Sequence, residues 1–83
     1  MEKLIRDPRH LAAVLRASRK AAAMTQADAG KRVGLQQKTV SRLESDQLGG
    51  CTVDSLFKLL AALDLECVVR PKDPGTTSMP GGW

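Results

Sequence analysis

Residues 25–44, TQADAGKRVGLQQKTVSRLE, have the pattern of two short helices joined by a tight turn. Thr25 is a favourable N-cap, and Asp28 lies three residues further along, a spacing at which two side chains can satisfy the unpaired N–H groups of a first helical turn. Gly34 stands where a helix can end in a left-handed residue, because glycine adopts that conformation without steric cost. The pattern therefore predicts one helix after Thr25, a turn at residues 33–35 and a second helix beyond it.

The second predicted helix has an apolar and a polar face. Val40 and Leu43 lie three residues apart on the face that we expect to be buried. The opposite face carries two pairs of polar side chains at four-residue spacing: Gln37 with Ser41, and Lys38 with Arg42. Glutamine can pair bidentately with a base edge, lysine and arginine reach guanine or phosphate, and an element of this width fits the major groove of B-DNA. From residue chemistry alone, a solvated helix face without a ligand is an equally good interpretation.

The complete stretch resembles the helix-turn-helix of the lambda-repressor-like, or XRE-type, regulators. About ten positions of different chemistry agree over about twenty residues. They are Gln26, Ala29–Gly30, Val33–Gly34–Leu35, Val40–Ser41 and Leu43–Glu44. The pair Ala29–Gly30 departs from the larger Leu–Ala usual in the family, which lowers the helix propensity of the first helix. The resemblance implies an all-α bundle of four to five helices, in which the second helix of the motif is the recognition helix for DNA.

Length and charge are consistent with such a protein. Eighty-three residues form one domain with a modest core. No run of about 20 apolar residues could span a membrane, and the N-terminus lacks the apolar core of a signal peptide, so we expect a cytoplasmic, nucleoid-associated protein. Residues 9–42 hold eight Lys or Arg and one acid, whereas residues 43–83 hold three bases and six acids. This asymmetry is typical of a protein that presents one face to a polyanion.

The residues before the motif predict another helix. Asp7 as N-cap and Pro8 at the first helical position begin it, and it runs to about Ala22. Its predicted inner stripe is Leu11, Val14, Leu15, Ser18 and Ala22. His10 is expected at the surface. By the resemblance, Arg19 near the end of this helix pairs with Glu44 at the end of the recognition helix and fixes its angle.

A further helix is predicted at residues 53–63, with Thr52 as its cap. Its apolar stripe consists of Val53, Leu56, Phe57, Leu60 and Leu63, extended by Leu59. Phe57 is the only phenylalanine, and we expect it to pack in the core rather than to stack on a cofactor. No cofactor and no metal are expected, because Cys51 and Cys67 have no partner His or Cys at ligand spacing. We expect Cys67 to be buried and Cys51 to be partly exposed.

Residues 65–70, LECVVR, alternate in the manner of a β-strand that ends at Pro71. A lone strand leaves its backbone groups unpaired. The best-matched partner is the same strand of a second copy, paired through Leu65, Cys67, Val68 and Val69; pairing with Leu4–Ile5 is a lesser option or an addition. We therefore expect a homodimer with recognition helices about one DNA turn, ~34 Å, apart and a pseudo-palindromic operator. Residues 1–71 form this domain, and residues 72–83, rich in Pro and Gly, form a flexible tail.

The whole layout, with a strand after the last helix and a tail that ends in Trp83, is similar to HipB-type antitoxins. The resemblance implies a DNA-binding dimer that binds a HipA-type serine/threonine kinase toxin and represses the operon encoding both. It assigns base contacts to Gln36, Gln37, Lys38 and Ser41. It assigns phosphate contacts to Gln26, Arg42, Lys31, Arg16 and Lys20. Trp83 is then the toxin anchor, because tryptophan is enriched among interface anchors; a terminal Trp without any role is the alternative.

Two other functions are alternatives to this one. A free-standing or phage-type XRE repressor without a protein partner is compatible with the same helix-turn-helix. An enzyme is disfavoured, because the sequence contains no Ser–His–Asp, Cys–His, paired-carboxylate or phosphate-loop arrangement.

Overall fold

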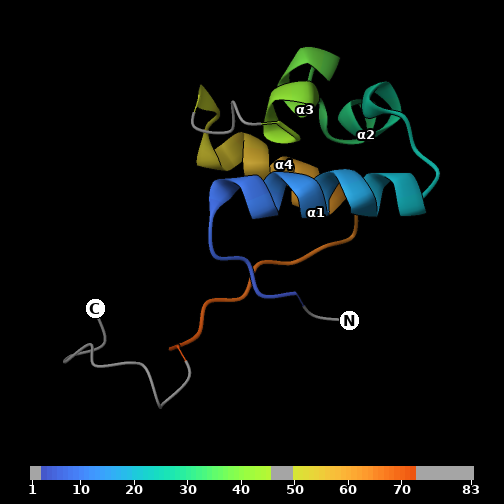
Figure 1. Ribbon diagram of the computed structural model, residues 1–83. Coiled ribbons are helices and arrows are strands. Elements are labelled where there is room, and N and C mark those ends of the chain that lie inside the picture. Colours follow the sequence, from blue (N-terminus) through green and yellow to red (C-terminus); the bar gives the residue numbers. More distant parts are fainter. Residues whose placement is uncertain (1–2, 46–49, 73–83) are drawn as a thin grey trace.

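Four helices make up the part of the chain that the computed structural model describes, residues 3–45 and 50–72. They are α1 (Pro8–Ala21), α2 (Gln26–Val33), α3 (Gln37–Leu43) and α4 (Val53–Ala62). Figure 1 shows α1 crossing the body, with α2 and α3 on one side of it and α4 behind it. The predicted all-α class is confirmed, and each helix lies where the sequence places it.

The helices α1 and α4 begin at the predicted caps. Asp7 Oδ1 accepts a hydrogen bond from the His10 N–H at 2.9 Å, and proline follows at the first helical position. Thr52 Oγ1 accepts from the Ser55 N–H at 3.0 Å. Each cap satisfies an N–H group that has no partner within its helix, so these two boundaries are set by local sequence.

The cap of α2 is reciprocal. Thr25 Oγ1 accepts from the Asp28 N–H, and Asp28 Oδ2 accepts from the Thr25 N–H, both at 3.0 Å. Hydrogen bonds from the backbone and side chain of Thr25 lower the pKa of the Asp28 carboxyl below its ordinary value, since they favour the charged form. The helix ends at Gly34, whose φ of 74° lies in the left-handed region. The turn between α2 and α3 thus follows from single residues, as predicted.

The core lies where α2, α3 and α4 meet and pack against α1. Its largest fully buried side chains are Leu15, Leu43, Leu59 and Val40. Gly30 of α2 approaches the turn so closely that a Cβ atom there would collide with the Leu35 carbonyl. The small residue at this position, which departs from the family pattern, lets α2 pack directly against the turn that leads into α3.

The apolar stripe predicted for α4 was too broad. Leu59, Ala62 and Leu63 are buried, but Phe57 is 53% exposed and Val53 is 71% exposed. The expectation that Phe57 packs in the core was therefore wrong. The other three helices cover only one face of α4, and that face is centred on Leu59. The side chains of Val53 and Phe57 lie outside it and remain in solvent.

Two smaller expectations on burial were also wrong. Cys67 is exposed, because the segment that carries it leaves the helical body after Asp64. Ala22 is exposed as well, since α1 ends one residue before it, whereas Ala12, which was not part of the predicted stripe, is buried. Cys51 is half-buried and His10 is exposed, as expected.

Residues 65–70 lie outside any helix or assigned strand in the single chain. A strand is assigned through its paired neighbour, and no segment of the described residues forms a ladder with this one. Pairing with a second copy therefore stays a prediction. Figure 1 shows this segment and residues 3–6 leaving the helical body on the same side, away from α3.

Candidate nucleic-acid interface

The polar face of α3 is open to solvent over its whole length. Gln36, Gln37, Lys38, Ser41 and Arg42 are all exposed. None of these side chains forms a hydrogen bond or ion pair with another residue of the described part of the chain. Gln36 is the N-cap residue of α3, yet its side chain makes no capping hydrogen bond. All five polar side chains are therefore directed at solvent and available to a ligand.

The opposite face of the same helix is fixed in the core. Val40 and Leu43 are completely buried. In a helix of seven residues these two anchors leave little freedom of rotation about the helix axis. Burial of one face thus determines which side chains the other face presents.

A bidentate ion pair joins α1 to Glu44, the residue at which α3 ends. Arg19 Nε donates to Glu44 Oε2 at 2.8 Å, and Arg19 Nη2 donates to Glu44 Oε1 at 3.1 Å. The two side chains are 11% and 2% exposed. Arg19 Nη1 also donates to the Met24 carbonyl at 2.7 Å, which ties the link between α1 and α2 into the same cluster. The pair implied by the family resemblance is present, and it ties the end of α3 to α1.

Gln26 at the start of α2 belongs to this cluster too. Its Nε2 donates to Glu44 Oε1 at 3.3 Å, and its side chain is half-buried. The family resemblance assigns Gln26 to a phosphate, and the amide group retains a second N–H for that purpose. Gln26 is therefore a candidate for a phosphate contact that is also bonded to the Arg19–Glu44 ion pair.

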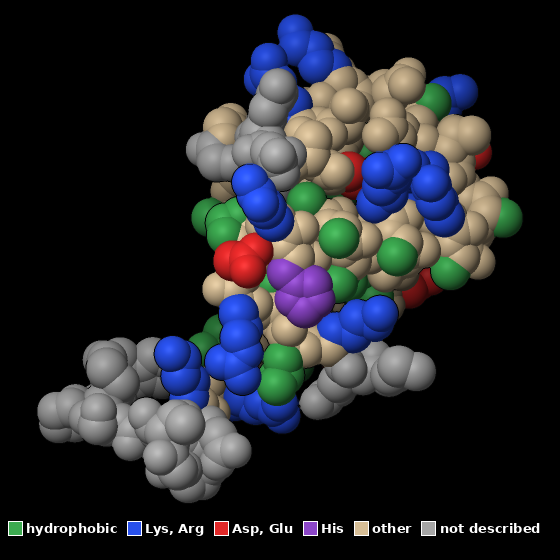
Figure 2. Space-filling model, viewed as in Figure 1, with side chains coloured by type: hydrophobic (Ala, Val, Ile, Leu, Met, Phe, Trp, Pro, Cys, Tyr) green, Lys and Arg blue, Asp and Glu red, His purple; other side chains and the backbone are tan. Residues whose placement is uncertain are grey.

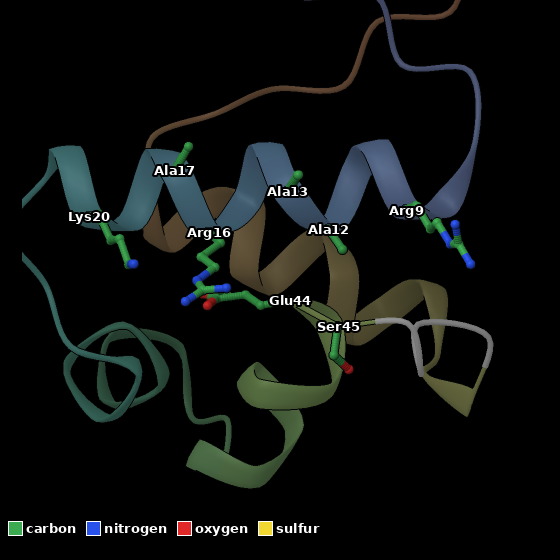
Figure 3. A pocket seen from close by; sticks show the side chains of 8 residues that line it. All are labelled: Arg9, Ala12, Ala13, Arg16, Ala17, Lys20, Glu44 and Ser45. Atoms are coloured by element: carbon green, nitrogen blue, oxygen red, sulfur yellow. The ribbon is translucent and has the colours of Figure 1, made fainter.

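Further positive charge comes from α1. Figure 2 shows Lys and Arg side chains spread over this face of the molecule, with few acidic ones among them. Arg9, Arg16 and Lys20 line a shallow hollow of about 380 Å³ between α1 and the end of α3. Figure 3 shows these three side chains directed toward the side of α1 on which Glu44 and Ser45 lie. The alanines between them, at 12, 13 and 17, leave the hollow open.

Lys31 is exposed on α2 and is not part of this hollow. The five residues assigned to phosphates thus fall into separate groups. Arg16 and Lys20 lie together on α1, Gln26 lies beside Glu44, and Arg42 and Lys31 lie on α3 and α2. Such a spread suits a backbone that passes over several helices rather than a small anion.

One arginine of the basic region has a structural role that the sequence did not reveal. Arg32 Nη1 donates to the Ala62 carbonyl at 3.2 Å, at the C-terminal end of α4. The last turn of α4 contains no basic residue of its own, so a cation from α2 complements its dipole. The two residues are 30 positions apart, and no local pattern marks such a contact.

Other kinds of site find little support in residues 3–45 and 50–72. No group of three or more His, Cys, Asp or Glu side chains there could hold a metal ion. No helix in the same ranges has the length and apolar character needed to cross a bilayer.

Comparison with known proteins agrees with the geometry. A family model described as a helix-turn-helix domain matches residues 10–69. A chain of the HipA–HipB–O2–O3 complex is 26% identical, with a TM-score of 0.80, and the match covers 87% of this chain and all of that one. A chain of the HipB–O4 20mer complex gives the same identity, coverage and TM-score.

A third solved structure is a chain described as a transcriptional regulator of the XRE family. It is 37% identical, with a TM-score of 0.60, over 83% of this chain and 79% of that one. No curated protein matches. The neighbours thus share the fold, and two of them come from complexes of HipB.

Proposed function

The chain belongs to the helix-turn-helix domain family, and we propose that it is a transcriptional repressor that binds operator DNA and serves as the antitoxin of a HipA-type kinase toxin. One observation carries the DNA-binding part: α3 and its N-cap residue present five exposed polar side chains with no partner in the described chain, on a helix anchored by Val40 and Leu43. The likeness to HipB supports the antitoxin part. Family and neighbours point to a regulator rather than an enzyme.

In this proposal α3 enters the major groove. Gln36, Gln37 and Lys38 contact base edges from the N-terminal end of the helix, and Ser41 assists one turn later. Phosphates on either side are held by a second set of residues: Gln26, Arg42, Lys31, Arg16 and Lys20. Base contacts supply discrimination between sequences, and phosphate contacts supply most of the salt-dependent affinity. The protein would act in the bacterial cytoplasm, on the nucleoid.

The proposed repressor is a homodimer. Its subunits pair through Leu65, Cys67, Val68 and Val69, so that two recognition helices lie about one DNA turn apart. The same surface of both subunits then meets at a two-fold axis, which accounts for a pseudo-palindromic operator.

Gln37→Ala tests the assignment of base contacts. The variant should lose about 1–3 kcal/mol of binding free energy at the operator and show relaxed preference at one base pair of each half-site. Fluorescence anisotropy with the operator, single-base variants of it and random duplex measures both effects. An equal loss on random duplex would contradict a base contact by Gln37.

Arg42→Ala tests the assignment of phosphate contacts and serves as the counterpart of the first variant. Binding to operator and to random duplex should weaken together, and the slope of log affinity against log salt should fall by about one. Salt titrations from low to physiological ionic strength give the slope. A loss limited to the operator would show that Arg42 contacts a base.

Trp83 is the proposed anchor for the kinase and lies outside the described residues. Deletion of Trp83 should leave operator affinity unchanged and weaken the complex with the kinase encoded beside it by about 2 kcal/mol or more, as for an aromatic hot spot. Isothermal titration with the purified kinase measures this. Unchanged kinase affinity would remove Trp83 from the interface.

A second candidate is a free-standing repressor with no toxin partner, which the likeness to an XRE family regulator favours. The two candidates differ in one observable. A kinase that co-purifies with the untagged protein from its native host supports the antitoxin, and a protein recovered with operator DNA alone supports the free-standing repressor.

A further inference from the structure

A large groove opens on the side of the molecule opposite α3. Its volume is about 1460 Å³. One wall is formed by residues 3–6 and the other by residues 64–72, the two segments that leave the helical body together in Figure 1. The floor is formed by side chains of α1 and α4: Leu11, Val14, Leu15, Ser18, Leu56 and Leu60. The groove therefore lies between the N-terminal and C-terminal segments and reaches the core at Leu15.

Both walls of the groove carry exposed apolar side chains. Leu4 is 54% exposed and Ile5 is 38% exposed on the N-terminal wall, while Val68 and Val69 are 67% and 73% exposed on the C-terminal wall. Below them Leu11, Leu56 and Leu60 are only partly buried and pack on the core. Contiguous apolar surface of this kind marks a surface that another chain covers.

Charge on the two walls fits a second copy as the partner. Lys3 and Arg6 are on the N-terminal wall, and the C-terminal wall carries Asp64 and Glu66 at its start and Arg70 and Lys72 at its end. In a pair of antiparallel segments related by a two-fold axis, the acidic start of one C-terminal wall lies opposite the basic end of the other, and the same contact repeats on the other side of the axis. Such a surface is complementary to itself in both charge and apolarity.

We propose that residues 3–6 form part of the interface between two copies. Residues 65–70 of the second copy occupy the groove, and Leu4 and Ile5 pack against Val68 and Val69 of the partner subunit. The inference rests on the dimer of the proposed function and adds the N-terminal segment to it. A two-stranded pairing alone is marginal and has two open edges. The N-terminal segments flank that pairing and bury its apolar residues.

Two single substitutions test this interface, Leu4→Asp and Ile5→Asp. Each places a charge on the N-terminal wall, where burial against the partner is costly. The dimer dissociation constant from sedimentation equilibrium should rise about tenfold or more, while the helical circular dichroism stays that of the unmodified protein. Val53→Asp is the control, because Val53 is an exposed apolar residue that does not line the groove. Its dissociation constant should not change.

An NMR measurement identifies which residues of the two chains are in contact and complements the dissociation constants. In a mixed dimer of ¹³C-labelled and unlabelled chains, isotope-filtered spectra should show contacts from the Leu4 and Ile5 methyl groups to valine methyl groups of the other chain. Unchanged dissociation constants for both Asp variants, or the absence of these contacts in a protein that is dimeric, would overturn the inference and leave the proposed dimer intact. An unmodified protein that is monomeric at every concentration would overturn both the role of residues 3–6 and the proposed dimer.

Discussion

Arg19→Ala should destabilise the folded protein by about 3–5 kcal/mol, the cost of leaving a buried charge without its partner. The Glu44 side chain is 2% exposed and receives two hydrogen bonds from Arg19. Without the guanidinium, Gln26 Nε2 is the side-chain donor to that carboxylate that remains among the described residues. The free energy of unfolding of a small domain is about 5–15 kcal/mol, so this single change should remove a large fraction of it. Urea denaturation followed by circular dichroism measures the difference.

Two further variants separate the charge effect from a general sensitivity to mutation. Lys58 pairs with Asp54 at 3.2 Å, but the side chains are 47% and 76% exposed, so Lys58→Ala should change stability by about 0.5 kcal/mol or less. Replacing both members, Arg19→Met with Glu44→Leu, should cost much less than Arg19→Ala, because no unpaired charge stays buried. A loss below about 1 kcal/mol for Arg19→Ala would show that solvent reaches Glu44.

Val69→Glu should convert the dimer into monomers and lower operator affinity by about 10²–10⁴, the gain that linked binding sites provide. Val69 is 73% exposed in the single chain, and the proposed pairing places it against the partner. Two glutamates close to a two-fold axis repel each other and would have to be desolvated. A monomer holds one recognition helix, so each monomer binds a single half-site without the gain in affinity that a linked second helix provides.

Sedimentation velocity and operator titrations measure the two effects together. Val53→Glu provides the control, since Val53 is 71% exposed but does not line the groove. That variant should stay dimeric and bind normally. A dimeric mass for Val69→Glu would exclude pairing through residues 65–70. A monomer with full operator affinity would show that operator binding does not require the dimer.

The sequence predicted the helices well because their boundaries depend on near neighbours. Thr25 and Asp28 are three residues apart, as are Thr52 and Ser55, and each pair forms the hydrogen bonds of a helix start. The left-handed Gly34 needs no distant partner. The same holds for the polar face of α3, because the positions of Val40 and Leu43 alone determine which side chains face outward.

The environment of α4 and of the last described segment could not be predicted in this way. The apolar pattern of α4 does not state how wide a face the other helices cover, so Phe57 was placed inside although it is exposed. The alternation in residues 65–70 indicates an extended segment, but it does not say whether its partner lies in the same chain or in a second copy. Cys67 was accordingly placed in a core that a single chain does not provide.

The sequence by itself determined the positions of the helices, the turn that joins α2 to α3 and the set of side chains on the outer face of α3, since interactions over three or four residues control all of these. Only the tertiary structure decided which cations remain available to a ligand. Arg19 is bound to Glu44 across 25 positions and Arg32 to the end of α4 across 30, so neither is free, whereas Lys38 and Arg42 are exposed. The physical reason is that a side chain's partner depends on which distant backbone and carboxylate groups folding brings within hydrogen-bonding distance.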